Sequence, residues 1–255
     1  MANLRPLLLL LFLAGSARAE WTVTSSQAER GAAAGVEHRR IVMSEGDTAE
    51  SATLDLALFS TKPATVRVID NPAGKNDGLA AAMRRERCLA GVNGGYFDPE
   101  HKPVGLVISD GRLLAPLRKA RLLSGVMVVS NAGIQLLRVA EYSPKRRATA
   151  ALQCGPFLVD RGQSVPGLNA TRSARRTFII TGGAERAAIG FCSGVTLAQL
   201  GEILATPGVA PELKVQRALN LDGGSSSAFW FAGERSPTSI PEQKTVRNFV
   251  AVVPK

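Results

Sequence analysis

Short apolar runs, separated by glycines and polar turns, recur along most of this chain and favour a fold built mainly of β-strands. In residues 52–59, leucines at every second position alternate with smaller or polar residues, which is the period of a strand with one buried face. We expect strands at residues 36–43, 52–59, 64–69, 104–109, 124–129, 134–139, 157–160, 177–181, 187–191, 219–221, 228–231 and 248–253.

Two segments carry the spacing of an amphipathic helix instead. Asp77 is expected to cap a helix that continues to about Arg87. Thr196 is expected to cap a second helix, in which the apolar residues at positions 197, 200, 203 and 204 form one stripe. Strands and helices do not alternate as they do in a doubly wound sheet. We therefore predict an α+β fold, a single domain in which a strand-rich mixed sheet is covered by a few helices.

The first 19 residues have the pattern of a secretory signal peptide. Arg5 precedes the apolar run 7–14, and Ala17-Arg18-Ala19 has the small-x-small form of a cleavage site. The apolar run is shorter than the roughly 20 residues of a membrane-spanning helix, and no later segment is long and apolar enough. We expect cleavage after Ala19, one domain over residues 20–255, and a periplasmic or secreted protein without a membrane span.

The chain is strongly basic. Its 31 lysines and arginines and 21 aspartates and glutamates give a formal net charge of +10, and removal of Arg5 and Arg18 with residues 1–19 leaves about +8. Such an excess attracts phosphorylated substrates, anionic glycans or a lipid surface. We expect no nucleic-acid partner, because aromatic residues make up only 5% of the chain and no nucleic-acid-binding motif occurs. The oligomeric state stays open.

The three cysteines are an odd number for an oxidising compartment. One disulfide with one free thiol and three reduced, buried thiols are both compatible with the sequence. Cys88 and Cys192 lie in apolar runs, which favours core packing. Cys154 would need a neighbouring base to act as a nucleophile, and none is identifiable, so we interpret it as structural.

Five of the apolar runs adjoin polar or glycine-rich motifs that could carry chemistry. In chain order they are NGGYF at 93–97, GLVISDG at 105–111, QCGPFLV at 153–159, RRT at 175–177 and LNLDGGSSS at 219–227. Paired glycines let a ligand approach the backbone, successive amides in such a turn can bind an anion, and an arginine can hold a phosphate through two hydrogen bonds. Each motif alone is weak: the glycine-rich motifs are equally typical of a turn between two core strands, and a single arginine at a strand end is more often a solvated charge.

Together, and in this order, the five motifs resemble those of the phosphodiester glycosidase family, and the resemblance extends from about residue 92 to residue 253. It implies a hydrolase that cleaves the bond between the anomeric carbon of a sugar and a phosphodiester, which releases free sugar and a phosphomonoester. The catalytic residues that it implies are Asp222, Arg176 and Asn93. The substrate-binding residues that it implies are Gly94, Gly95, Gln153, Gly155, Thr177, Gly223, Gly224, Ser225 and Ser226.

The implied reaction gives each residue type a role. The departing phosphate gains negative charge, which Arg176 and glycine-rich amides would stabilise. Asp222 would activate water or stabilise an oxocarbenium-like centre, with Asp98 as a candidate second carboxylate. Asn93 would orient sugar hydroxyls or phosphate oxygens, and the serines of the last motif would donate hydrogen bonds to the anion. No cofactor is certain, although aspartates at strand ends could hold calcium or magnesium.

Three other functions are compatible with parts of the sequence. A Ser-His-Asp hydrolase would have to use His38 or His101, and the chain lacks a G-x-S-x-G motif. A metal-dependent phosphodiesterase would use the aspartates as ligands. A non-catalytic protein that binds cell-envelope glycans or an exopolysaccharide would use the same cleft and tolerate loss of Asp222. The sugar and the group beyond the phosphate are left open, so we expect only a general role in carbohydrate metabolism at the cell envelope.

Overall fold

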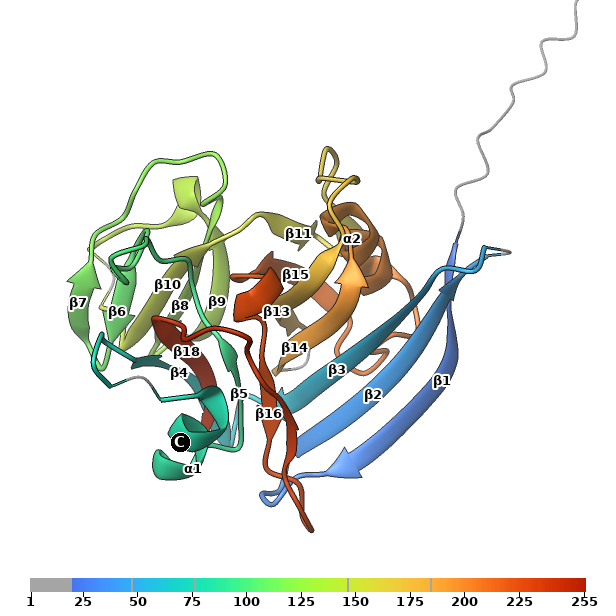
Figure 1. Ribbon diagram of the computed structural model, residues 1–255, viewed down its shortest axis with the longest axis horizontal. Helices are drawn as coiled ribbons and strands as arrows, with labels where there is room; N and C mark the ends of the chain where they lie inside the picture. The colour runs from blue at the N-terminus through green and yellow to red at the C-terminus, as the bar shows by residue number, and fades with distance from the viewer. Residues whose placement is uncertain (1–19, 47, 76, 146, 184) are drawn as a thin grey trace, which may run out of the picture.

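The computed structural model describes residues 20–255, apart from positions 47, 76, 146 and 184. The predicted signal peptide, residues 1–19, lies outside the described residues. The predicted strand-rich α+β fold is confirmed, and the strands divide into three antiparallel sheets (Figure 1). No helix in the described part of the chain is long and apolar enough to cross a membrane.

The largest sheet has eight strands in the order β1-β2-β3-β14-β13-β15-β11-β12. Their bounds are β1 (Trp21–Arg30), β2 (Val36–Glu45), β3 (Ser51–Ser60), β14 (Arg186–Val195), β13 (Ala174–Gly182), β15 (Val215–Asn220), β11 (Phe157–Asp160) and β12 (Gln163–Ser164). Strand β1 lies at the edge and is exposed over most of its length, which explains why its polar sequence did not predict a strand. The central strands are buried on both faces.

Two five-stranded sheets complete the domain. One has the order β7 (Arg112–Ala115), β6 (Val107–Ser109), β10 (Ala150–Cys154), β8 (Gly125–Ser130) and β9 (Gly133–Arg138). The other has the order β17 (Thr238–Ile240), β16 (Phe229–Phe231), β5 (Ala90–Asn93), β18 (Asn248–Pro254) and β4 (Ala64–Asp70). One core cluster joins residues from all three sheets, among them Phe59 of β3, Met127 of β8 and Phe229 of β16. The three sheets therefore share one interior.

Helix α2 (Leu197–Ala205) begins where the sequence predicted. The hydroxyl of Thr196 accepts a hydrogen bond from the amide of Gln199 at 3.2 Å, and the Gln199 side chain accepts one from the Thr196 amide at 3.0 Å, which forms a capping box. Leu200, Ile203 and Leu204 are buried against the large sheet. The helix therefore covers the outer face of that sheet (Figure 1).

Helix α1 (Leu79–Arg85) is shorter than predicted and has a different cap. It begins after Gly78 rather than Asp77, and neither residue supplies a side-chain hydrogen bond to the first turn. Instead the amide of Leu79 donates to Oε1 of Glu242 at 2.8 Å. The prediction at Asp77 was wrong because the acceptor for this helix end comes from a loop far along the chain.

The predicted strand at 104–109 is reduced to β6. The amide of Val104 donates to the carbonyl of Tyr96 at 2.8 Å, and Gly105 has a φ of 102°, so the backbone turns before the sheet begins. These residues bring the NGGYF motif against the start of β6.

Candidate functional site

The segments that follow β5 and β15 and the segment that precedes β11 meet beside β13. The amide of Leu221 donates to the carbonyl of Thr177 at 2.9 Å, and that of Asp222 donates to the carbonyl of Gly94 at 3.0 Å. The amide of Asn220 donates to the carbonyl of Pro156 at 3.0 Å. Motifs that lie far apart in the sequence are thus joined by backbone hydrogen bonds.

A cavity of about 430 Å³ opens at this junction. Five predicted site residues contribute to its wall, namely Arg176, Asp222, Gly223, Gly224 and Ser225. Its other lining residues are Tyr96, Leu122, Asn169, Arg172, Ala174, Leu197, Asn220 and Lys244. The wall therefore contains three cationic side chains and one carboxylate.

Asp222 supplies that carboxylate. Its Oδ1 accepts a hydrogen bond from the amide of Gly223 at 2.9 Å. Burial raises the pKa of the Asp222 carboxyl above its ordinary value, although the nearby Ser226 hydroxyl, the charge of Lys244 and the Gly223 amide act in the opposite direction. A desolvated carboxylate of this kind is a stronger base than an exposed aspartate.

Arg176 is a buried cation, 8% exposed, and the structure shows how it is oriented. Its Nε donates to the carbonyl of Val195 at 3.1 Å and its Nη2 to the carbonyl of Arg172 at 2.6 Å. No carboxylate of the described residues lies within ion-pair distance, and burial lowers the pKa of the guanidinium. A buried cation without a counterion favours the binding of an anion.

The adjacent Arg175 has a different function in the fold. Its guanidinium donates to the carbonyls of Ser227 and Pro241 and lies over the ring of Phe191, with 5.2 Å between Cζ and the ring centroid. It therefore joins the glycine–serine turn to the loop after β17 and does not line the cavity.

Tyr96 and Asn220 form a wall that the sequence prediction did not include. The Tyr96 hydroxyl donates to the carbonyl of Gly155 at 2.7 Å and accepts a hydrogen bond from Nδ2 of Asn220 at 3.2 Å. Burial raises the pKa of Tyr96, which keeps the phenol neutral. Nδ2 of Asn220 also donates to the Gly155 carbonyl at 2.9 Å, so this carbonyl holds two side chains that line the cavity.

Asn93 does not line the cavity. It is fully buried, its Nδ2 donates to the carbonyl of Asp222 at 2.7 Å, and its Oδ1 accepts from the amide of Ala228 at 3.1 Å. The buried Thr177 hydroxyl lies 2.9 Å from Asn93 Oδ1 and 2.7 Å from the Asp222 carbonyl. In this structure the Asn93 side chain therefore holds the Asp222 backbone together with Thr177, and contact of Asn93 with a substrate stays a prediction.

Gly94 and Gly95 also face protein rather than a ligand. A Cβ at Gly94 would lie 1.9 Å from Oδ1 of Asn248, and that oxygen accepts a hydrogen bond from the amide of Gly95 at 2.8 Å. The close approach to the backbone that we predicted does occur, but the approaching group is the side chain of Asn248.

Gln153 and Gly155 do not line the cavity but contact the loop that carries its lining residue Leu122. The buried Gln153 amide accepts from the amides of Leu106 and Arg118 and donates to the carbonyls of Arg118 and Leu123. A Cβ at Gly155 would lie 2.3 Å from the carbonyl of Leu122. Gln153 therefore holds the loop that brings Leu122 to the cavity, and its own side chain is saturated with hydrogen bonds to the protein.

In the last motif, residues 222–225 line the cavity, whereas Ser226 and Ser227 are buried. Gly224 has a φ of 63° with open space around it, and Ser225 is exposed at the cavity. The Ser226 hydroxyl is buried beside Asp222 and makes no hydrogen bond of standard geometry to any described residue. The predicted role of Ser225 as a direct donor stays a prediction, whereas Ser226 is placed to act on Asp222.

All three cysteines are free and buried. Burial raises the pKa of Cys88 to about 11 and also raises the pKa values of Cys154 and Cys192. A protonated, enclosed thiol is a poor nucleophile, which agrees with the structural interpretation of Cys154.

The residues required by the alternative chemistries lie elsewhere. His38 Nε2 is 2.8 Å from Oδ1 of the buried Asp55, and His101 Nε2 is 3.1 Å from the carbonyl of Asn71, so neither histidine lines the cavity. Asp98 accepts from the amide of Lys102 at 2.8 Å within its own turn. Nowhere in the described part do three His, Cys, Asp or Glu side chains form a group that could hold a metal. A single carboxylate among three cations does not suit calcium or magnesium.

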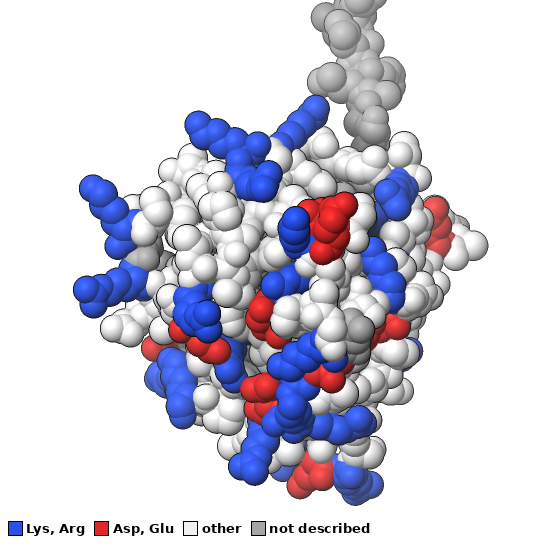
Figure 2. All heavy atoms as spheres, turned by 60° about the vertical axis from the view of Figure 1, so that its left-hand side comes forward, with Lys and Arg blue, Asp and Glu red and all other residues white. Residues whose placement is uncertain are grey.

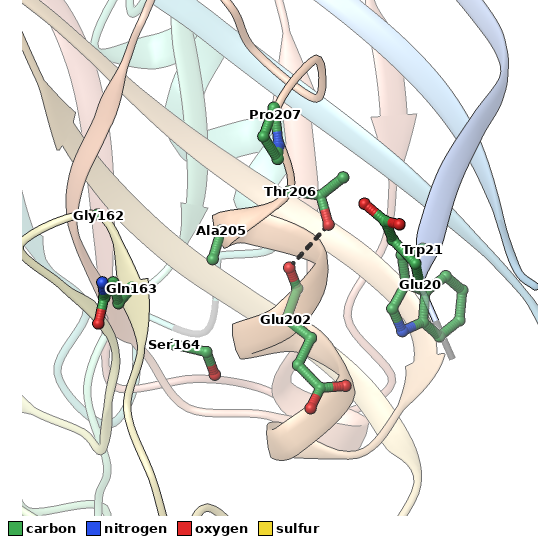
Figure 3. Close-up of a pocket in the computed structure, with 9 residues that line it drawn as sticks. All are labelled: Glu20, Trp21, Gly162, Gln163, Ser164, Glu202, Ala205, Thr206 and Pro207. Atoms are coloured by element: carbon green, nitrogen blue, oxygen red, sulfur yellow. Dashed lines mark hydrogen bonds between the residues drawn. The ribbon is translucent and has the colours of Figure 1, made fainter. Parts of the chain in front are cut away.

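A larger cavity, of about 540 Å³, lies between the start of β1, the turn before β12 and the end of α2 (Figure 3). Its charged side chains are Glu20 and Glu202, and the hydroxyl of Thr206 donates to the carbonyl of Glu202 at 3.0 Å. It contains none of the predicted site residues and no cation to bind phosphate. We therefore take the smaller cavity as the candidate active site.

Several lining residues were missed by the sequence analysis. Arg172 and Asn220 lie in or beside quoted motifs, so their proximity to Arg176 and Asp222 was the available signal. Lys244 had no such signal. It reaches the cavity from the loop after β17, where its Nζ lies 4.9 Å from the centroid of the Phe97 ring.

A family model described as phosphodiester glycosidase matches residues 86–253 of the chain. A comparison with curated protein sequences finds no significant match.

Solved structures show the same fold. The catalytic domain of zebrafish N-acetylglucosamine-1-phosphodiester alpha-N-acetylglucosaminidase, auto-inhibited by its pro-peptide, matches with a TM-score of 0.65 and 16% identity, over 91% of this chain and 88% of that one. A hypothetical protein from Synechocystis matches with a TM-score of 0.58 and 13% identity, over 87% of this chain and 62% of that one. A putative exported protein from Burkholderia pseudomallei matches with a TM-score of 0.56 and 13% identity, over 81% of this chain and 75% of that one.

Proposed function

The chain belongs to the phosphodiester glycosidase family, and from that premise we propose that it hydrolyses the bond between the anomeric carbon of a sugar and a phosphodiester. The products are the free sugar and a phosphomonoester. One observation carries the proposal: a single cavity contains a desolvated carboxylate, Asp222, and a buried arginine, Arg176, that has no counterion among the described residues.

The cations of the cavity match the charge that develops in this reaction. A phosphodiester carries one negative charge, and the departing phosphate gains a second as the bond to the sugar breaks. Arg176 is held in place by backbone carbonyls, so it stabilises the growing charge without having to reorganise. Arg172 and Lys244 add positive charge at the same wall.

Asp222 acts in its ionised form, as a base toward water or as a stabiliser of the oxocarbenium-like centre. The Gly223 amide, the Ser226 hydroxyl and Lys244 all favour the carboxylate over the acid. Phosphate is already a good leaving group, so the reaction does not require a second carboxylate as a strong general acid. The cavity accordingly presents only one.

We place this reaction outside the cytoplasm because residues 1–19 have the pattern of a signal peptide. Its substrate is then a sugar phosphodiester or an anionic glycan of the cell envelope. N-terminal sequencing of the protein recovered from the periplasm or the medium tests this part, and a retained Met1 contradicts it.

The decisive experiment separates the two bonds of the diester. Purified protein is incubated with a series of sugar-1-phosphodiesters in water enriched in ¹⁸O, and the phosphorus product is analysed by mass spectrometry. We expect a phosphomonoester without ¹⁸O, because water attacks the anomeric carbon. An ¹⁸O-labelled phosphomonoester, or release of sugar 1-phosphate, would show attack at phosphorus and reject the glycosidase in favour of a phosphodiesterase.

A matched pair of variants tests the role of Arg176. We expect R176Q to lower kcat/KM by about a hundredfold to a thousandfold, because one preorganised donor to the developing charge is lost. The exposed Arg235 serves as the control, since R235Q removes the same charge away from the cavity. Substrate binding by the wild-type protein with no turnover of any diester would favour the non-catalytic glycan-binding alternative.

A further inference from the structure

The segment from Arg112 to Leu122 joins exposed apolar side chains to unpaired cations beside the cavity. It comprises strand β7, at the edge of its sheet, and the loop that follows. Four large apolar side chains are exposed among the described residues, and three of them belong to this segment: Leu113 at 63%, Leu117 at 36% and Leu122 at 50%. We call residues 112–122 the docking segment.

The docking segment is also uniformly basic. Its charged residues are Arg112, Arg118, Lys119 and Arg121, all of them exposed. None of the four takes part in an ion pair among the described residues, and the acidic neighbour Asp110 is bound to Arg67, with 2.8 Å between Oδ1 and Nε. On the side of the molecule that carries β7, lysine and arginine side chains project along the upper and left edges, and the acidic side chains lie mostly toward the centre and the lower part (Figure 2).

The backbone at the base of the loop is fixed. The buried Gln153 side chain holds the amide of Arg118 at 2.9 Å, the carbonyl of Arg118 at 2.7 Å and the carbonyl of Leu123 at 3.2 Å. The amide of Leu123 donates to the carbonyl of Ala120 at 3.1 Å. The fold therefore holds the leucines in water instead of folding them into the core.

We propose that the docking segment binds the surface of an anionic lipid bilayer. The cations would contact lipid phosphates, and the leucines would enter the boundary between head groups and acyl chains. A soluble anionic polymer would satisfy the cations but leave the leucines in water, so the combination favours a membrane.

The position of Leu122 links this surface to the candidate active site. Leu122 lies both in the docking segment and in the cavity wall, and its carbonyl packs against Gly155. A bilayer that contacts the docking segment is therefore next to the cavity opening. The proposal concerns binding alone and does not depend on the hydrolytic activity.

Vesicle sedimentation tests the proposal with the full chain, so that residues 1–19 contribute equally to every variant. The vesicles contain phosphatidylcholine alone or phosphatidylcholine with phosphatidylglycerol. We expect preferential binding to the anionic vesicles. R118Q/K119Q/R121Q should lower the partition constant about a hundredfold, and L113S/L117S about tenfold. The control K75Q/K214Q/R235Q removes three exposed cations elsewhere and should bind like the wild type.

Two outcomes overturn the proposal. One is equal binding by the wild type and both docking-segment variants. The other is loss of binding in the cation variant with full binding in L113S/L117S, which would show an anion-binding loop that does not enter lipid. Hydrogen exchange of the unmodified protein gives a second measurement that needs no variant: amides of residues 112–122 should be protected by anionic vesicles and not by neutral ones.

Discussion

The chain contains two glycine-pair turns that look alike in sequence and differ in the structure. Asn93-Gly94-Gly95 begins at the last residue of β5, and Asp222-Gly223-Gly224 follows β15. The first is wholly buried and its polar groups are bound to protein, whereas the second lines the cavity. The two are joined, because the Asp222 amide donates to the Gly94 carbonyl. The buried Asn93 turn thus supports the Asp222 turn at the cavity.

Substitution of Asp222 should have the largest effect, because it should lower activity while it raises stability. We expect D222N to lower kcat by about a thousandfold or more, because the reactive carboxylate is lost. Its raised pKa in the folded state means that the ionised form opposes folding, and stability is lost as pH rises through that pKa. D222N should therefore melt at a higher temperature than the wild type at neutral pH.

Calorimetry checks the second half of this prediction. At about pH 3, where the carboxyl is protonated in both folded and unfolded states, the gain in melting temperature should disappear. A D222N variant that melts lower than the wild type at neutral pH, or that keeps its activity, would contradict the assignment.

An added methyl group should destabilise the buried turn more than the open one. G94A places Cβ 1.9 Å from Asn248 Oδ1 inside the core, and we expect a loss of about 3 kcal/mol in the free energy of unfolding. G224A meets open space and suffers only from its φ of 63°, at about 1 kcal/mol. Urea denaturation measures both, and equal losses would remove the distinction between a buried and an open turn.

Asn93 should reveal its positioning role through kinetics. N93A removes the hydrogen bonds to the Asp222 carbonyl and the Ala228 amide, and we expect it to cost about 2 kcal/mol of stability. Because the side chain acts through Asp222, kcat should fall about tenfold while KM changes little. A large rise in KM with kcat unchanged would instead show direct contact with substrate.

The smallest expected effect concerns Lys244 and the pH profile. Its charge lowers the pKa of Asp222, so K244Q should raise that pKa. Since Asp222 acts when ionised, the acid limb of kcat/KM should move to higher pH. R235Q again serves as the control, and an acid limb that moves to lower pH would assign the titration to another group.

The sequence was informative where local pattern and burial agree. Alternating leucines at 54, 56 and 58 identified β3, and Thr196 with Gln199 identified the start of α2. Asp222 and Arg176 were selected because the motifs that contain them resemble those of the phosphodiester glycosidase family. The strand-rich fold follows from such local signals.

The rest depended on distant contacts. Nothing near Gln153 in the sequence shows that its side-chain amide binds the backbone of residues 118 and 123. From the sequence alone, a ligand was an equally plausible hydrogen-bond partner. Lys244 reaches the cavity only because its loop is tied to the glycine–serine turn, where the Gln243 amide donates to the Ser225 carbonyl at 2.8 Å. Which polar groups face a cavity is decided by tertiary packing.

Strand β18 completes the sheet that supports the turn carrying Asp222. It is the last strand in chain order, yet it lies between β5 and β4, and its Asn248 holds both glycines of the NGG turn. A chain that emerges from the ribosome in order must leave this sheet incomplete until residues 248–254 arrive. The turn that carries Asp222 rests on the NGG turn, so it lacks this support until residues 248–254 have been made, and this part of the fold forms late in synthesis.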